Sequence, residues 1–182
     1  MREDLLQVRS FGVSFYALRD ARGVYLIDCG FIGGAGALRR ALRARGWEGE
    51  RILGIIVTHG HLDHILNVSR LAAETGAWIA APALDMPHYE GRPCYHGAAR
   101  FTGFLEAIGR RVLGFHPFVP TRVLEDGDGI DVWHGLTVVH LPGHTAGHCG
   151  LYCRSLRLLF CADLFASLRS IFPFSARHFE CR

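Results

Sequence analysis

The chain has 182 residues, of which 49% are hydrophobic and 20% are charged, and its formal net charge is +3 with neutral histidines. This length suits one ordinary domain, which can bury roughly 70% of its unfolded surface without disulfide staples. The balanced charge and frequent aromatic residues exclude a disordered chain, and no apolar run approaches the roughly 18 residues that span a bilayer. The weak, scattered positive charge argues against nucleic-acid binding.

The residue types limit the mechanism, the cellular compartment and the role of the cysteines. All 20 basic residues are Arg, so no Lys can take part in a mechanism. The first ten residues are charged and lack the apolar core of a signal peptide, which predicts a cytoplasmic protein. The six cysteines have no C-x-x-C spacing, which favours reduced, buried thiols over a disulfide or metal role; they are Cys29, Cys94, Cys149, Cys153, Cys161 and Cys181.

The first third of the chain reads as alternating strands and helices. The expected strands are Ser10–Leu18, Gly23–Cys29 and Arg51–Val57, with a helix over Ala37–Arg45 that ends at Gly46. The Gly-rich stretch Gly33–Gly36 lacks both the G-x-G-x-x-G spacing and a P-loop Lys, so it is predicted to be a turn into that helix.

A polar motif directly follows the apolar strand Arg51–Val57, and a helix over Asp63–Thr75 and a strand over Ala77–Ala81 come after it. In this β-loop-α-β order the motif lies at the carboxyl end of a strand, where α/β sheets place their sites. An irregular stretch, Pro82–Tyr95, and a helix over Gly97–Leu113 follow. The irregular stretch contains Tyr89 and Tyr95, which are candidates for binding substrate.

The last third of the chain is predicted to be strands and turns. Leu136–Leu141 is an expected strand, and Cys149–Cys153 with Leu156–Cys161 is an expected hairpin. Asp126–Gly129 begins like a calcium loop but lacks the later ligands, so it is interpreted as a turn.

The polar motif, T-H-G-H-L-D-H, carries four side chains of the kind that bind metal ions: His59, His61, Asp63 and His64. In an extended loop, residues 59 and 61 point the same way, so their imidazoles can face one point. Three imidazoles and a carboxylate within six residues suit a borderline metal such as zinc. Two later strands also end in ligand types, namely His144 after Leu136–Leu141 and Asp163 after the predicted hairpin.

These motifs resemble the metallo-β-lactamase fold superfamily. Thr58–His64 is similar to its T-H-x-H-x-D-H signature, Leu141–His148 to its P-G-H-T-x-G-H segment, and Ala162-Asp163 to its bridging aspartate position. The segment Gly23–Gly30 resembles the strand and turn that precede the signature. The resemblance implies an α/β fold, a four-layer αββα sandwich, in a single domain over residues 1–182.

The resemblance also implies a ligand set. His59, His61 and His144 would hold one zinc ion, and Asp63, His64 and the bridging Asp163 would hold a second. The residue at the position of His148 is usually not a metal ligand in such proteins but lies next to the ligands and supports them. The Glu that replaces the second His of the signature in flavodiiron proteins is absent, because position 61 is His, which favours hydrolysis over di-iron redox chemistry.

The resemblance stops near the C-terminus. The superfamily supplies a further metal ligand from a strand several dozen residues beyond the aspartate, whereas only 19 residues follow Asp163 here. His178 is the one histidine among them, and its surroundings do not resemble that strand. We therefore expect a domain incomplete at the C-terminus, without the last strand and helix, whose open edge would favour association with a second copy.

The function expected is that of a zinc-dependent hydrolase with one or two ions, acting on a small-molecule ester, thioester or lactone, with Asp63 orienting the attacking water and taking its proton. Ile65-Leu66 replaces the Gly-Gly common in glyoxalase II, so no substrate is assigned. A β-lactamase role is disfavoured by the lack of Lys, and a nuclease role by the lack of a basic arm.

Two other readings stay open. One is a mononuclear iron enzyme of the persulfide dioxygenase type, with a triad of His59, His144 and Asp163. The other is an incomplete, non-catalytic metal-binding module that depends on a partner. Metal identity, oxygen uptake and size in solution would discriminate among them.

Overall fold

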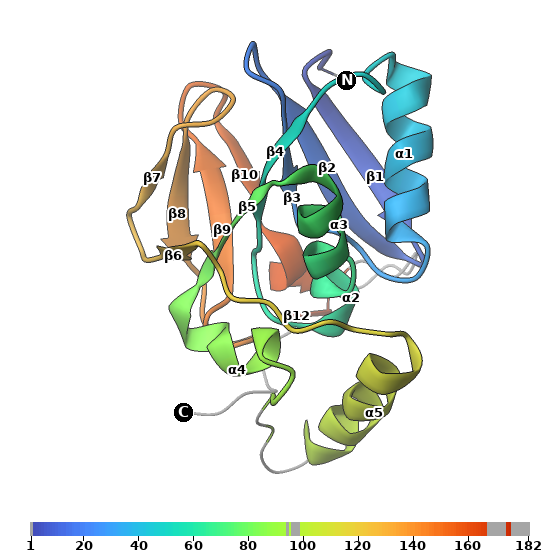
Figure 1. The fold of residues 1–182 in the computed structure, drawn as a ribbon. Helices are drawn as coiled ribbons and strands as arrows, with labels where there is room; N and C mark the ends of the chain where they lie inside the picture. Colours follow the sequence, from blue (N-terminus) through green and yellow to red (C-terminus); the bar gives the residue numbers. More distant parts are fainter. Residues whose placement is uncertain (1, 94, 96–98, 167–173, 176–182) are drawn as a thin grey trace.

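The fold is built on a six-stranded sheet, seen in a computed structural model that describes residues 2–93, 95, 99–166 and 174–175. The strands follow one another in chain order across the sheet (Figure 1). β1, β2 and β3 are antiparallel neighbours, whereas β3, β4, β5 and β6 are parallel. The bounds are β1 Leu5–Ser10, β2 Val13–Arg19, β3 Val24–Ile27, β4 Ile52–Ile56, β5 Trp78–Pro82 and β6 Arg122–Leu124.

The prediction of one opening strand over Ser10–Leu18 is wrong, because the chain reverses at Phe11-Gly12. Both residues have positive φ, 47° and 89°, and Ser10 pairs with Val13 across the turn. A two-residue turn with positive φ at both positions is one of the two types that match the twist of a hairpin. Phe11 is not a turn-forming residue type, so the sequence hides this turn inside an apolar run.

Helices cover one face of the six-stranded sheet, where α1 and α3 lie (Figure 1). Ala35, Leu38 and Leu42 of α1 are buried in the core between this layer and the sheet. The helices are α1 Gly34–Arg45, α2 Leu62–Ile65, α3 Val68–Thr75, α4 Met86–Tyr89 and α5 Ala99–Val112, with a short 3-10 turn, η1, over Ala83–Asp85. The stretch predicted to be irregular thus contains η1 and α4.

The prediction of one helix over Asp63–Thr75 is also wrong, since α2 and α3 are separate. The break lies at Asn67, whose side-chain amide donates to the carbonyl oxygens of Cys29, Gly30 and Phe31 at 3.1, 3.1 and 2.8 Å. These contacts tie the start of α3 to the loop after β3.

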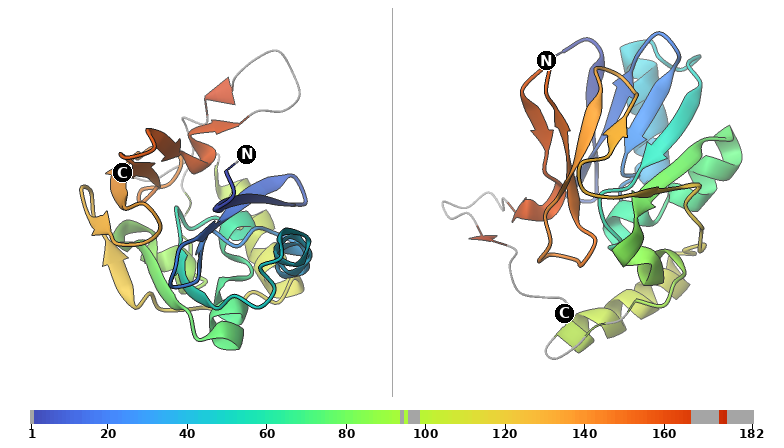
Figure 2. Two further views of the ribbon diagram at one scale, coloured as in Figure 1. Left: turned by 90° about the horizontal axis from the view of Figure 1, so that it is seen from above. Right: turned by 90° about the vertical axis from the view of Figure 1, so that its left-hand side faces the viewer.

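A four-stranded antiparallel sheet packs on the other face of the first sheet. Its order is β10-β9-β8-β7 (Figure 2). Its strands are β7 Gly129–Ile130, β8 Leu136–His140, β9 Cys149–Cys153 and β10 Leu158–Phe160, followed by a 3-10 turn, η2, over Ala162–Leu164 and the short pair β11 Phe165–Ala166 and β12 Phe174–Ser175. The predicted hairpin of the last third is β9–β10.

Strand β3 shows how the layers are joined. All four of its residues are buried. Val24 and Leu26 enter the core beneath the helices, whereas Tyr25 and Ile27 enter the core between the two sheets. Successive side chains of a strand point to opposite faces, so a strand buried on both sides reads as a continuous apolar run.

The mixed α/β fold is confirmed, with two facing sheets and a helical layer over one of them. No helix among the described residues covers the outer face of the four-stranded sheet, where Leu159 is 42% exposed. Helix α5 carries an apolar face that is also exposed and includes Phe101, Phe104 and Ile108. Within the part of the chain that the structure describes, no helix is long and apolar enough to cross a membrane.

Replacement of Asn67 by Ala tests the break between α2 and α3. The variant removes the side-chain donor of the Cys29 and Gly30 carbonyl oxygens, while the Phe31 carbonyl keeps the N–H of Gly34. We therefore expect the free energy of unfolding to fall by about 1–3 kcal/mol. Urea unfolding measures it. Arg70→Ala, at an exposed position of the same helix, is the control and should change stability by no more than about 0.5 kcal/mol. Equal losses in the two variants would contradict the assignment.

Candidate metal centre

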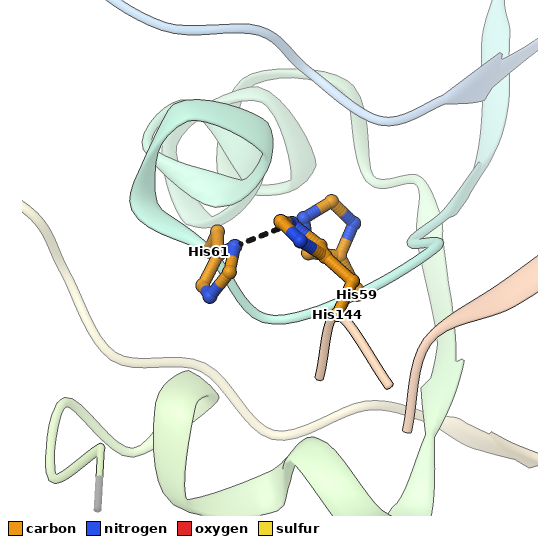
Figure 3. Close-up of side chains that lie close together, drawn as sticks. All are labelled: His59, His61 and His144. Atoms are coloured by element: carbon orange, nitrogen blue, oxygen red, sulfur yellow. Dashed lines mark hydrogen bonds between the residues drawn. The ribbon is translucent and has the colours of Figure 1, made fainter. Parts of the chain in front are cut away.

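Three imidazoles meet where loops from the two sheets come together. His59 and His61 lie in the loop after β4, and His144 lies in the loop between β8 and β9. One potential ligand atom of each lies within 4.8 Å of the others. Nδ1 of His61 is 2.8 Å from Nε2 of His144 (Figure 3). The two-residue spacing in the first loop therefore places both of its imidazoles beside the third, as the sequence predicts.

A second group shares His59 and adds His64 and Asp163, again with ligand atoms within 4.8 Å of one another. Oδ1 of Asp163 is 3.3 Å from Nε2 of His64, and Oδ2 is 3.4 Å from Nε2 of His144. The carboxylate therefore lies between an imidazole of each group. This is the position that a bridging ligand needs.

Asp63 is at the rim of the site. Its Oδ2 is 3.9 Å from Nε2 of His64, and its side chain is 38% exposed. Neither group of potential ligands within the described residues includes it. Its role as a ligand or as a base stays a prediction.

A buried carboxylate, Asp28, orients two of the imidazoles. It accepts the Thr58 hydroxyl and the His64 Nδ1–H, at 2.8 and 2.9 Å. Because the Thr58 hydroxyl donates its one hydrogen to Asp28, it accepts a hydrogen bond from Nδ1 of His59, 3.1 Å away. Both histidines thus carry hydrogen on Nδ1 and direct Nε2 toward the site, as metal-binding histidines commonly do.

Burial and the neighbouring charges shift the pKa values of His59 and His64 in opposite directions. Burial lowers the pKa of His59 well below its usual range, and the neighbouring imidazoles lower it further. Burial also opposes protonation of His64, but Asp28 and Asp163 outweigh it and raise the pKa of His64 well above its usual range. Burial raises the pKa of Asp163, yet His144 and His64 lower it by more, so this carboxyl stays ionised.

His148 lies behind the first triad. Its ring centroid is 5.3 Å from that of His59 and 5.7 Å from that of His144. Its Nδ1 donates to the carbonyl oxygen of Leu141 over 2.8 Å. Burial lowers its pKa, so the ring is neutral. His148 is in neither group of potential ligands, and the supporting role that the resemblance implies stays a prediction.

The residues present fit a divalent transition metal. Among the described residues, Nε2 of the fully buried His59 has no hydrogen-bond partner. An unpaired, buried polar atom is costly unless a cation or a donor satisfies it. Neutral imidazole nitrogens with a carboxylate form the donor set that zinc and similar ions prefer. His59, His61 and His144 are the residues that would hold such an ion, with His64 and Asp163 beside them.

A pocket of about 400 Å³ opens beside these residues. Its polar lining residues are His61, Asp63, Tyr95 and Glu106, and its apolar wall includes Phe11, Phe31, Leu62 and Leu105. The ring of Tyr95 stacks on that of His61 with centroids 6.4 Å apart. Tyr89, by contrast, is fully buried and stacks on Phe118, so the prediction that it binds substrate is wrong.

Sequence reasoning missed the residues that hold the ligands. Asp28 is preceded by a buried strand and has φ of 59°, which few non-glycine residues adopt, and its position at a strand end is the signal that was available. Asp85 and Arg110 also contact the ligand loops, but they come from η1 and α5, far away in sequence. His178 lies outside the described residues.

Fold and site together define a class of protein. Two facing sheets with a helical layer present loops at their strand ends, and these loops gather imidazoles and a carboxylate in an arrangement suited to one or two metal ions. The sequence model of the metallo-beta-lactamase superfamily matches residues 8–175 of the chain. The chain therefore belongs to that superfamily.

Known relatives support this placement. The probable metallo-hydrolase YflN of Bacillus subtilis is 27% identical over 150 residues, which are 76% of this chain and 54% of the relative. The hydroxyacylglutathione hydrolase of Aeromonas hydrophila is 33% identical over 112 residues, 60% of this chain and 32% of the relative. The chain thus spans about a third to a half of the length of these relatives.

Solved structures agree on the fold. The metallo-beta-lactamase MIM-1 from Novosphingobium pentaromativorans superposes with a TM-score of 0.68 at 27% identity, covering 86% of this chain and 56% of that one. The metallo-beta-lactamase GOB-18 from Elizabethkingia meningoseptica has a TM-score of 0.68 at 23% identity, covering 83% and 54%. At 23% identity, the similarity to GOB-18 shows a shared fold and nothing more.

Replacement of Asp28 by Asn tests how the imidazoles are oriented. The carboxylate accepts the Thr58 N–H on Oδ1 and both the Thr58 hydroxyl and the His64 Nδ1–H on Oδ2. An amide has only one acceptor oxygen, so it would turn an N–H₂ group toward the donors on one of these two sides. We expect the affinity for zinc to fall about 10–100-fold, as for other residues that orient metal ligands. Competition with a coloured chelator measures the affinity. An unchanged affinity in a folded variant would contradict the assignment.

Proposed function

We propose that the protein is a zinc-dependent hydrolase that cleaves an ester, thioester or lactone bond in a small molecule. The observation that carries the proposal is the meeting of His59, His61 and His144, with His64 and Asp163 adjoining, at the edge of an open pocket. The relatives named as hydroxyacylglutathione hydrolases support a thioester as the leading substrate class.

The chemistry is divided between the ion and the side chains. When bound, a zinc ion lowers the pKa of a coordinated water to about 7 and polarises a carbonyl oxygen. The neutral His59 offers its Nε2 for such an ion, and the ionised Asp163 is placed between two ligand groups. Asp63, partly exposed and lining the pocket, would orient the attacking water and accept its proton on a carboxylate oxygen.

The bond changes balance without a further reactant. The water oxygen bonds to the acyl carbon, and the carbon–oxygen or carbon–sulfur bond to the leaving group breaks. The proton held on Asp63 then passes to the leaving oxygen or sulfur, which restores the carboxylate. The apolar wall that includes Phe31 and Leu105 favours a substrate with an apolar group next to the reacting carbonyl.

The proposal includes the cellular compartment and the association of the protein. Four cysteines, Cys29, Cys149, Cys153 and Cys161, are free thiols, which supports a reducing, cytoplasmic compartment. The exposed apolar residues of α5 and of the four-stranded sheet support association with a second copy or another part of a longer protein. The alternative remains a mononuclear iron enzyme that uses His59, His144 and Asp163.

Metal content tests the proposal most directly. We expect the protein, purified without added metal, to hold at least one zinc ion per chain by elemental analysis. A His59→Ala, His144→Ala double variant removes two of the three imidazoles of the first triad and should lose that ion. His116→Ala, at an exposed histidine, is the matched control and should keep it. No metal in the native protein would overturn the proposal, and iron with oxygen uptake would favour the alternative.

Asp63→Asn tests the catalytic step. The amide keeps the size of the side chain but cannot take a proton, so we expect kcat for thioester hydrolysis to fall about 10²–10⁴-fold. Metal content should be measured beside the activity. A loss of activity with metal retained supports Asp63 as the base, and full activity would exclude that role.

A further inference from the structure

The backbone of Gly60, in the middle of the first ligand loop, is held at its N–H and at its carbonyl oxygen by side chains from other elements. Its N–H donates to Oδ2 of Asp85 over 2.8 Å, and its carbonyl oxygen accepts from Arg110 over 3.2 Å. The third side is closed, because a Cβ at position 60 would lie 2.4 Å from Cβ of His88. The loop between the two ligands therefore has little room to move.

Asp85 holds the second ligand loop as well. Its Oδ2 also accepts the hydroxyl of Thr145 over 2.6 Å, and its Oδ1 accepts the N–H of Gly147 over 2.7 Å. Asp85 and Thr145 are fully buried. A Cβ at position 147 would lie 2.8 Å from the carboxylate. One buried carboxylate thus connects the loop of His59 and His61 with the loop of His144.

Arg110 approaches from the opposite side and is also buried, at 6% exposure. Its guanidinium donates to the carbonyl oxygen of His88 over 2.8 Å and to Oε1 of Glu106, with Nε 3.1 Å from that oxygen. Its carbon lies 4.5 Å from the ring centroid of Phe115. The hydroxyl of Tyr95, whose ring lines the pocket, donates to the same Glu106. The buried charge is therefore paired and satisfied, as such a charge must be.

We propose that Asp85 and Arg110 are positioning residues for the metal centre. Together they hold the two peptide groups that flank Gly60 and so set the separation of His59 and His61. Asp85 also sets the approach of His144. The inference rests on the proposed function, because it assigns these residues to the same metal centre. Neither residue lies in either group of potential ligands within the described chain.

The chemistry of the two side chains explains why these types are needed. The three donors that meet Asp85 require an acceptor at both carboxylate oxygens. An asparagine would place an N–H₂ group against the N–H of Gly60 or that of Gly147. Arg110 donates to several acceptors in fixed directions through its planar guanidinium, which a lysine ammonium cannot reproduce.

The test compares zinc affinity in matched variants. Asp85→Asn and Arg110→Met keep the approximate size of the side chains and remove the contacts. We expect the zinc dissociation constant, from chelator competition, to rise about 10–100-fold in each. Asp131→Asn and Arg111→Met, at exposed positions, are the controls and should bind zinc as the native protein does.

A second readout separates positioning from general damage to the fold. With cobalt(II) in place of zinc, the visible absorption of the ion reports its ligand geometry. We expect changed bands in Asp85→Asn and Arg110→Met, and partial recovery in Asp85→Glu, whose carboxylate can still accept. Native bands and native affinity in both variants would overturn the inference.

Milder variants keep the test decisive if Asp85→Asn does not fold. Thr145→Val removes one donor of the network, and Arg110→Lys retains the charge but loses the fork. Each should weaken zinc binding by more than Asp131→Asn and Arg111→Met do, and native binding in both would overturn the inference. If the native protein binds no zinc or other metal, the proposed function fails. If it binds zinc and the variants bind equally well, only the positioning role fails.

Discussion

The interaction on which the site depends is the acceptance of three hydrogen bonds by the buried carboxylate of Asp28. It joins the end of β3 to the first ligand loop, through the N–H and hydroxyl of Thr58, and to α2 through His64. A buried charge is tolerated only when it is paired and hydrogen-bonded, and this one is satisfied by donors that it in turn orients. The result is that two imidazoles, His59 and His64, present Nε2 to the same space. Without that carboxylate, neither tautomer would be set.

The layered fold explains why this carboxylate can reach both partners. β3 is buried on both faces, with its neighbours β2 and β4 on either side, so the residue after it emerges at the end of the sheet already surrounded by protein. The parallel partner β4 ends beside it and continues into the ligand loop. The facing sheet adds His144 and Asp163 from its own strand ends. The centre is therefore assembled across two sheets, and the buried carboxylate of Asp85 links the ligand loops that the two sheets supply.

The sequence predicts the metal-ligand types best where they are close neighbours in the chain. His59, His61 and His64 lie within one loop and turn, and a spacing of two residues is enough to align the first pair. Asp163 was found because ligand types at strand ends meet at one edge. The supporting residues escaped because their partners are distant in sequence: Asp85 meets Gly60 and Thr145, and no local pattern marks such a contact. The two wrongly predicted element bounds at Phe11-Gly12 and Asn67 have different causes. The Phe11-Gly12 turn has an unusual residue type, and the break at Asn67 depends on carbonyl groups in another loop.

The last constraint is electrostatic and connects metal binding to folding. The ring centroid of His59 is 4.2–5.3 Å from those of four other histidines, so the cluster cannot be protonated throughout without strong repulsion. Burial keeps His59 neutral, whereas the two carboxylates that flank His64 hold a proton on it. A divalent cation would satisfy the neutral nitrogens and replace that proton. Because its ligands come from loops of both sheets, such an ion would also cross-link the two sheets, and any ion that binds the folded chain alone stabilises it by mass action. Nε2 of His59, buried and without a hydrogen-bond partner among the described residues, is thus an atom through which metal binding would add to the stability of the fold.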